Sequence, residues 1–276
     1  MTSILLVGCG KMGGALLSGW CANGAADSFV IVEPNKQSIP NIGANPNITF
    51  VQDFAGIPST FSPDAIVMAV KPQAMNDVVP AYTGLANSAL TLSIAAGTPI
   101  SFFEALFGTN ASIVRAMPNT PAAIGRGMSV LCANTSTTDN QKKLAEILMQ
   151  AAGAVEWITD ENLMDAVTAL SGSGPAYVFH LIEAMASAGE ALGLKPELAA
   201  KAALQTVAGA GELARLSSET PSVLRQNVTS PGGTTAAALD VLMAEDGLRA
   251  LMERAMTAAR NRGRELGAGQ ERIGLK

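Results

Sequence analysis

The sequence has few of the residues on which many catalytic and metal sites depend. It contains one histidine, His180, and three scattered cysteines without a CxxC pair. A single histidine weighs against a histidine-based zinc site and a Ser-His-Asp triad, so we expect no metal. His180 lies in an apolar helical pattern, which favours a packing role over a catalytic one. The unpaired cysteines, and the lack of a secretory signal pattern, predict a cytoplasmic protein.

Charged residues and long apolar runs are also scarce. Charged residues make up 15% of the 276 residues, the net charge is −5, and no basic patch stands out. We therefore expect no nucleic-acid partner. No unbroken apolar run reaches about 18 residues, so we expect no membrane-spanning helix. The length suffices for two domains, each with its own core.

Short apolar runs alternate with helical patterns over the first 160 residues. The expected strands cover residues 3–7, 29–33, 65–70, 90–95, 112–117, 128–132 and 155–158. This alternation predicts an α/β fold with a mostly parallel, Rossmann-type sheet. Segments rich in Gly, Pro and Asn follow several of these strands, at the edge where such sheets bind ligands.

The character of the chain changes near Asp160. Beyond it no strand pattern is evident, and helices are expected over residues 163–170, 176–192, 196–216 and 234–266. The middle helices are rich in Ala, Gly, Leu and Met, and a monomer would leave much of that apolar surface exposed. We therefore predict a domain of residues 1–160, and an all-α domain of residues 161–276 that forms a homodimer.

A glycine-rich turn follows the first expected strand and opens a helix. Its sequence, Gly8-Cys9-Gly10-Lys11-Met12-Gly13, has the GxGxxG spacing. In this context the glycines form the tight turn, let the backbone approach a pyrophosphate, and pack the helix on the strand. We predict that Gly8, Gly10, Lys11, Met12 and Gly13 bind a dinucleotide. A purely structural glycine turn is the alternative.

Glu33 stands at the end of the second strand, about 20 residues after the fingerprint, where NAD-binding proteins carry an acid. Its carboxylate would bond the ribose 2′-hydroxyl of NAD and repel the 2′-phosphate of NADP. Asn35 and Lys36 follow closely, and Lys36 either pairs with that phosphate or is a solvated loop charge. The residues therefore leave both NAD and NADP open.

Three later strands end in segments that suit the rest of a nicotinamide cofactor: Ala69-Val70-Lys71-Pro72, Ala95-Ala96-Gly97 and Met117-Pro118-Asn119. The small residues would let the ribose and nicotinamide approach the backbone. Lys71 would neutralise phosphate or orient the nicotinamide ribose; a solvent-exposed charge at a strand end is the alternative. The proline-stiffened third segment would form a wall of the nicotinamide pocket.

A second small-polar loop, Ser230-Pro231-Gly232-Gly233-Thr234-Thr235, opens the last expected helix. Its backbone N–H groups and the helix dipole suit a carboxylate. A purely structural turn, with a threonine as the N-cap of the helix, is the alternative.

No lysine or arginine occurs from Leu144 to Leu194. A β-hydroxy-acid dehydrogenase would need an acid/base group there. Reduction of a C=N bond depends less on such an acid/base group, because a protonated iminium already accepts hydride.

Taken together, the sequence resembles the pyrroline-5-carboxylate reductase family essentially from end to end. The resemblance is carried by the fingerprint, Ala69–Pro72, Ser93–Gly97, Arg115–Pro121, Ser171–Phe179 and Ser230–Thr235, of which the last two are the most specific. It implies reduction of L-1-pyrroline-5-carboxylate to L-proline by NADPH or NADH, the last step of proline biosynthesis. It also implies interlocked dimers, which in some members assemble further into rings.

The resemblance assigns a substrate site as well. It implies that Thr235 is the catalytic residue, with its hydroxyl near the ring nitrogen. The implied substrate-binding residues are Glu161, Asn227, Val228, Ser230, Gly232, Gly233, Thr234 and Thr235. Family members that favour NADPH carry small polar or basic residues where this chain has Glu33-Pro34. Two alternatives remain, namely another cyclic-imine or keto-acid reductase on the same scaffold, and a nucleotide-sensing module without turnover.

Overall fold

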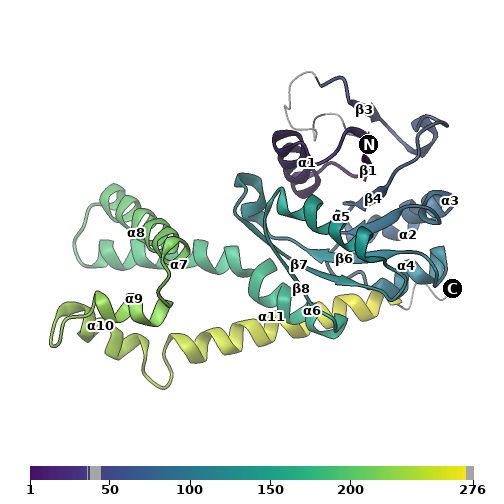
Figure 1. Cartoon of the computed structure of the whole chain (residues 1–276). Coiled ribbons are helices and arrows are strands. Elements are labelled where there is room, and N and C mark those ends of the chain that lie inside the picture. Colours follow the sequence, from purple (N-terminus) through teal and green to yellow (C-terminus); the bar gives the residue numbers. More distant parts are fainter. Residues whose placement is uncertain (36, 38–44, 272–276) are drawn as a thin grey trace. The chain divides into compact units, whose positions relative to one another are not determined.

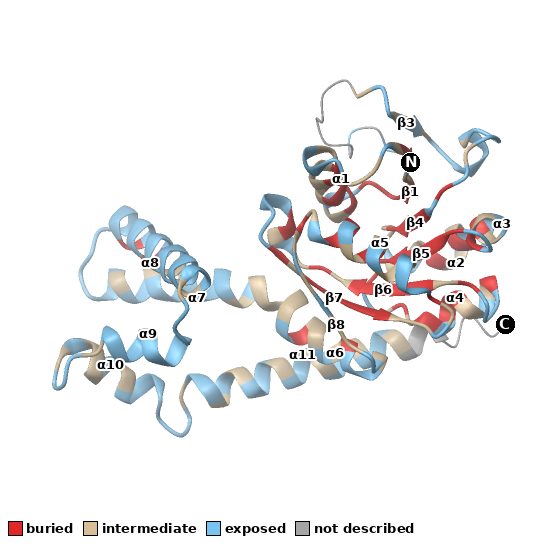
Figure 2. Ribbon diagram, in the orientation of Figure 1, coloured by how far each residue is buried: buried red, intermediate tan, exposed pale blue. Residues whose placement is uncertain are grey.

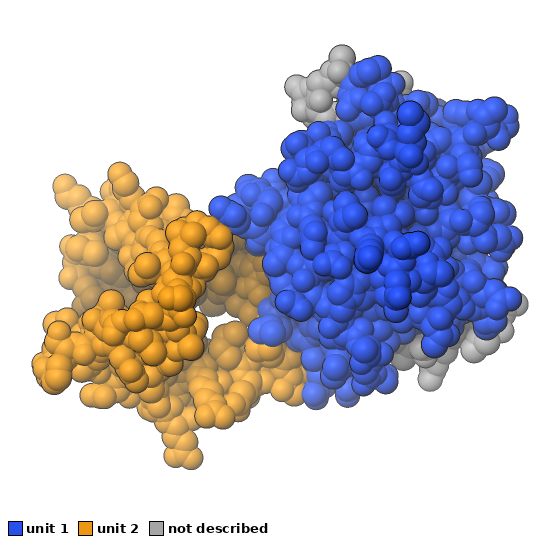
Figure 3. Space-filling view, viewed as in Figure 1, with its two compact units in different colours: residues 1–172, 259–276 blue, residues 173–258 orange. Residues whose placement is uncertain are grey.

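The chain forms two compact units in the computed structural model, which describes residues 1–35, 37 and 45–271. The first unit comprises Met1–Gly172 and Ala259–Lys276, and the second comprises Ser173–Ala258 (Figure 3). The boundary predicted from the sequence, between residues 160 and 161, thus lies 12 residues before the division by contacts, at 172. The chain also returns to the first unit at its end, which the sequence did not suggest. Each unit is described by itself below.

The first unit is built on a sheet of eight strands in the order β3-β2-β1-β4-β5-β6-β7-β8 (Figure 1). The strands are β1 (Ser3–Val7), β2 (Ser28–Val32), β3 (Ile48–Val51), β4 (Ala65–Met68), β5 (Leu90–Ser93), β6 (Ile113–Met117), β7 (Gly127–Ala133) and β8 (Gly153–Trp157). All neighbours are parallel except β6 and β7. The strand order reverses between β1 and β4, which is where open α/β sheets bind ligands. The predicted Rossmann-type sheet is confirmed, with β3 as an additional edge strand.

Helices cover both faces of this sheet. The α-helices that lie wholly within the first unit are α1 (Lys11–Asn23), α2 (Met75–Val78), α3 (Thr83–Ala86), α4 (Ile100–Phe107), α5 (Asp139–Gln150) and α6 (Met164–Val167). Between them lie 3-10 turns at Phe54–Gly56, Pro72–Ala74, Val79–Tyr82, Thr120–Ile124 and Glu161–Leu163, and a π turn at Thr168–Gly172 follows α6.

Alternation along β1 shows why two layers of helices form. Ile4 and Leu6 belong to the core that contains α1 and α5, whereas Leu5 and Val7 belong to the core that contains α2, α3, α4 and α6. All four side chains are buried, as expected of a parallel strand covered on both faces. The buried residues accordingly concentrate in and around the sheet (Figure 2).

The second unit is helical. It contains α7 (Gly174–Ala191), α8 (Pro196–Leu216), α9 (Pro221–Asn227), α10 (Thr234–Leu242) and the first part of α11 (Leu248–Glu271). Only Ala199 and Ala203 are buried in these helices of the single chain (Figure 2). Large apolar side chains are exposed on each of them, among them Phe179, Leu216, Val223, Val241 and Leu251. No helix in the described part of the chain is both long and apolar enough to cross a membrane.

Two expectations for the helices are wrong. The single helix expected over residues 234–266 is two helices, α10 and α11, separated by residues 243–247. The break follows from Asp246-Gly247, a turn dipeptide; a Cβ at Gly247 would collide with the Leu242 carbonyl oxygen. The helix expected over residues 163–170 is a 3-10 turn, the short α6 and a π turn.

Candidate active site

The glycine-rich turn between β1 and α1 has the geometry of a dinucleotide-binding loop. Gly8 has φ +90°, and a Cβ there would lie 2.9 Å from the Ala69 carbonyl group. A Cβ at Gly13 would lie 2.5 Å from the Gly8 carbonyl oxygen, so both glycines are required by packing. A Cβ at Gly10 would meet no atom within 4 Å. Gly10 is also the N-cap of α1 and supplies no side-chain cap. The open space and the uncapped helix start fit a pyrophosphate group.

Glu33 is tied to this turn by two hydrogen bonds. Its carboxylate accepts the backbone N–H of Cys9 at Oε2 (2.7 Å) and the backbone N–H of Asn35 at Oε1 (2.9 Å). The carboxylate is therefore held against the fingerprint, at the position expected for an acid that binds a ribose hydroxyl. Burial, together with the negative charge of Glu33, raises the pKa of the Cys9 thiol to about 11. Cys9 is consequently a protonated, buried filler of the turn.

A cavity of about 570 Å³ lies beside the turn. It brings together the predicted residues Gly8, Gly10, Glu33, Ala69, Val70 and Lys71. The predicted Lys11, Met12, Gly13, Asn35 and Pro72 adjoin it in sequence, while Lys36 lies outside the described residues. Residues 95–97 come after β5, and residues 117–119 are the last residue of β6 and the two that follow it, farther along the same carboxyl edge.

The cavity also has a wall that the sequence analysis missed. Asp53 and Phe54 come from the segment after β3, and Asp77 and Tyr82 from the short helices after β4. Burial and the charge of Asp53 raise the pKa of Tyr82 to about 12, so its hydroxyl stays protonated. Three of the lining residues are acids, and Lys71 is the one cation among the described lining residues. The short, mostly apolar segment Ile48–Val51, which forms β3, was the weak signal that could have revealed this wall.

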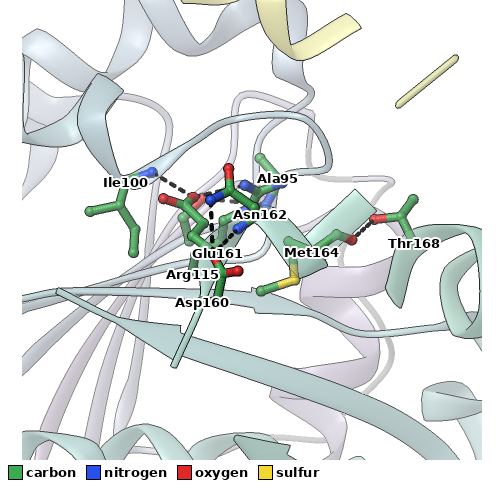
Figure 4. A network of polar contacts seen from close by, with 9 residues as sticks. Ala95, Ile100, Arg115, Asp160, Glu161, Asn162, Met164 and Thr168 are labelled. Atoms are coloured by element: carbon green, nitrogen blue, oxygen red, sulfur yellow. Dashed lines mark hydrogen bonds and ion pairs between the residues drawn. The ribbon is translucent and has the colours of Figure 1, made fainter. Parts of the chain in front are cut away.

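A second cluster lies at the start of α4 (Figure 4). Arg115 Nη1 donates to Glu161 Oε1 at 2.7 Å, and the backbone N–H of Ile100 donates to the same oxygen at 2.9 Å. The Arg115 side chain is only 8% exposed. The cluster borders a polar cavity of about 250 Å³ whose other lining residues are Gly97, Pro99, Ser101, Asn162, Asp165, Arg264 and Gly267. Glu161, predicted to line the substrate site, is here part of an ion pair within the first unit.

Asn119 braces the end of β6. Its Nδ2 donates to the carbonyl oxygen of Ser171 (3.1 Å) and to the Ser171 hydroxyl (3.3 Å), and its Oδ1 accepts the backbone N–H of Met128 (2.8 Å). A Cβ at Gly172 would collide with the Met117 side chain, so these segments pack closely. The Asn119 amide thus stiffens the wall predicted to border the nicotinamide, and its role in cofactor binding stays a prediction.

The small-polar loop before α10 belongs to the second unit. Gly232 has φ +67°, and the backbone N–H of Gly233 donates to the Ser230 carbonyl oxygen at 3.0 Å. Gly233, not a threonine, is the N-cap of α10, and it provides no side-chain cap. Thr234 and Thr235 begin the helix, whose first N–H groups are suited to an anion. The Asn227 amide nearby donates to Glu219 Oε2 at 3.0 Å.

The fold and the glycine-rich turn define a two-domain, dinucleotide-dependent oxidoreductase. Residues 3–97 match the family model described as NADP oxidoreductase coenzyme F420-dependent, and residues 161–266 match the model of pyrroline-5-carboxylate reductase dimerisation. The chain is 42% identical to the pyrroline-5-carboxylate reductase of Pseudomonas aeruginosa over 95% of its own length and 96% of that protein. The chain belongs to the pyrroline-5-carboxylate reductase family.

Solved structures agree with this assignment. The pyrroline-5-carboxylate reductase of Coxiella burnetii is 36% identical, with a TM-score of 0.88 over 96% of this chain and 98% of that one. The Plasmodium falciparum pyrroline carboxylate reductase, solved with NADP bound, is 31% identical, with a TM-score of 0.79 over 96% of this chain and 98% of that one. The similarity covers both units, which confirms the fold class and the family resemblance.

Proposed function

We propose that this chain reduces L-1-pyrroline-5-carboxylate to L-proline with a hydride from NADH or NADPH, the last step of proline biosynthesis. The observation that carries the proposal is the glycine-rich turn, where Gly8 and Gly13 are fixed by packing and Gly10 faces open space before an uncapped helix. Similarity to reductases of this substrate over nearly the whole chain supports the choice of reaction.

The cofactor would be held along the carboxyl edge of the sheet, and when bound it supplies the hydride. The N-terminus of α1, with Gly8, Gly10, Lys11, Met12 and Gly13, would bind the pyrophosphate. Glu33 and Asn35 would contact the adenosine ribose. The remaining contacts are assigned to Ala69, Val70, Lys71 and Pro72, to Ala95, Ala96 and Gly97, and to Met117, Pro118 and Asn119.

The substrate would be held by the loop before α10. Its carboxylate would accept hydrogen bonds from the backbone N–H groups of Thr234 and Thr235, at the start of α10, where the helix dipole favours an anion. The Thr235 hydroxyl would support the ring nitrogen as it becomes an amine. The proton would come from the iminium itself or from solvent. Ser230, Gly232, Asn227 and Val228 would shape the rest of the pocket. The family resemblance also assigns Glu161 to substrate binding.

The helical unit fits a homodimer. Large apolar side chains are exposed on its helices in the single chain, and it overlaps the match to a dimerisation model. Burying such surface against a second copy is favourable by roughly 25 cal/mol per Å². We propose that dimers can assemble further into a ring and that the protein works in the cytoplasm; its three unpaired cysteines suit a reducing compartment.

The test is the consumption of NADPH and NADH, in parallel, with freshly prepared pyrroline-5-carboxylate. Turnover supports the reaction, whereas cofactor binding without turnover on any cyclic imine contradicts it. Activity on an open-chain 2-keto acid, without activity on pyrroline-5-carboxylate, would favour the keto-acid alternative.

The role of Thr235 is tested by a pair of variants. Thr235→Ala should lower kcat/KM by about 10- to 100-fold, because one placed donor is lost. Thr235→Ser keeps the hydroxyl and should retain most of the activity. Equal activity of the alanine and serine variants would contradict the role.

A further inference from the structure

The Arg115–Glu161 pair lies beside one of the segments assigned to the cofactor. We infer that Glu161 is a positioning residue that anchors the loop Ile94–Pro99, and through it the cofactor-binding residues Ala95, Ala96 and Gly97. This inference rests on the proposed function. It gives Glu161 a task different from the substrate contact implied by the family resemblance.

The first argument comes from the start of α4. The N-cap of this helix is Pro99, which has no side-chain donor or acceptor to cap it. The backbone N–H of Ile100 is instead satisfied by Glu161, which lies 61 residues later in the chain. A carboxylate at a helix N-terminus also interacts favourably with the helix dipole. Glu161 therefore acts as a remote cap that fixes where α4 begins.

The second argument is that both ends of the loop are tied to Arg115. At the start of the loop, Ser93 is the strand partner of Arg115 in the pairing of β5 with β6. At its end, Ile100 is linked to Arg115 through one oxygen of Glu161. Gly97, which has φ +72°, lies between these two fixed points and lines the same cavity as Arg115 and Glu161. The loop is thus held at both ends by one residue, through the backbone pairing of Arg115 at its start and through the Arg115 guanidinium group and Glu161 at its end.

The third argument concerns the hydrogen bonds that the Glu161 carboxylate already accepts. Its Oε1 already accepts two hydrogen bonds, from a backbone N–H and from a guanidinium group (Figure 4). Arg115 is nine-tenths buried, and a buried cation needs its partner. Removing the acceptor oxygen would leave the Arg115 guanidinium without this hydrogen bond and release the start of α4. The cofactor-binding segment would then lose one of its two anchors.

The experiment must separate positioning from simple stabilisation of the fold. Glu161→Gln keeps an acceptor oxygen and should bind reduced cofactor within about 3-fold of the unmodified protein. Glu161→Ala removes the anchor and should raise the Kd for NADH and NADPH by about 10-fold, the size expected for losing one charge-assisted hydrogen bond. Asp165→Asn is the matched control, because it alters the same cavity at a side chain whose partner Arg264 is 59% exposed and 4.0 Å away.

The decisive variant replaces both partners, as Arg115→Met with Glu161→Leu. Exchanging a buried ion pair for apolar residues often preserves stability, so the melting temperature should recover. The N–H of Ile100 still lacks its acceptor, so the Kd for reduced cofactor should remain about 10-fold raised. The Kd is measured by nicotinamide fluorescence without substrate, which keeps the result independent of whether pyrroline-5-carboxylate is turned over. A double variant that melts normally and binds cofactor as tightly as the unmodified protein would overturn the inference.

Discussion

Replacing Glu33 with glutamine is expected to shift the cofactor preference toward NADPH. Glutamine keeps one acceptor oxygen, which can still accept the N–H of Cys9 and hold the side chain against the turn, while its NH2 group cannot accept the N–H of Asn35. What changes is the charge at the position where an acid meets the adenosine ribose. Asp53 and Asp77 line the same cavity, so the unmodified site is acidic and the substitution removes the carboxylate bound to the fingerprint.

The size of the effect follows from the charges. A phosphate monoester carries about −1.5 to −2 charges near neutral pH. Two unit charges about 5 Å apart repel by about 0.8 kcal/mol in water and about 1.7 kcal/mol at an effective dielectric constant of 40. Because Glu33 is partly exposed, its repulsion of a 2′-phosphate should be about 1 to 3 kcal/mol. This corresponds to about 5- to 150-fold in the Kd for NADPH.

The assay is a fluorescence titration of the unmodified protein, Glu33→Gln and Asp77→Asn with NADH and NADPH at one ionic strength. Asp77→Asn removes a charge from the same cavity but leaves the Glu33 hydrogen bonds intact, so it should change the NADH-to-NADPH ratio less. Added salt should shrink the difference between the cofactors, since it screens the repulsion. An unchanged ratio in Glu33→Gln, or an equal shift in Asp77→Asn, would refute the reasoning.

A substitution at Gly13 and alkylation of Cys9 both test the glycine-rich turn. Gly13→Ala should abolish cofactor binding and lower the melting temperature, because its Cβ would lie 2.5 Å from the Gly8 carbonyl oxygen; Gly84→Ala, with no neighbour within 4 Å of its Cβ, is the control and should be nearly silent in calorimetry. Cys9, with its pKa raised from 9.0 to about 11, should resist alkylation by iodoacetamide at pH 8 in the folded protein. The pKa of the Cys9 thiol is higher in the folded protein, about 11, than its ordinary value of 9.0. The protonated thiol therefore contributes to the stability of the folded state below about pH 9, and this contribution is lost as the pH rises toward 11. Rapid alkylation without unfolding would contradict that environment.

The parts of the fold that the sequence predicted depend on local signals. The buried run of β1, the glycine spacing and the acid at the end of β2 lie within 33 residues, and each has its own pattern. The small-polar loop before α10 was likewise visible from its composition. By contrast, β3 has only four residues, two of them exposed, so its pattern is weak.

The features that were missed depend on the tertiary structure. Arg115 and Glu161 are 46 residues apart, and nothing local in either segment indicates that their side chains form a hydrogen-bonded ion pair. The break between α10 and α11 was overlooked because Leu242-Met243-Ala244-Glu245 are all good helix formers, which masked the turn signal after them. The return of α11 to the first unit is a matter of packing, which periodicity alone does not specify.

That return has a consequence for protein engineering. The chain leaves the first unit after Gly172 and rejoins it at Ala259, inside α11, so the second unit is one uninterrupted insertion. Residues 173–258 therefore form a natural cassette for chimeras. Exchanging this cassette with that of a relative would transplant the Ser230–Thr235 loop and the apolar helices in one step, without altering the glycine-rich turn. Truncation before α11 would instead remove part of both units, so the chain does not divide into two halves that could be produced separately.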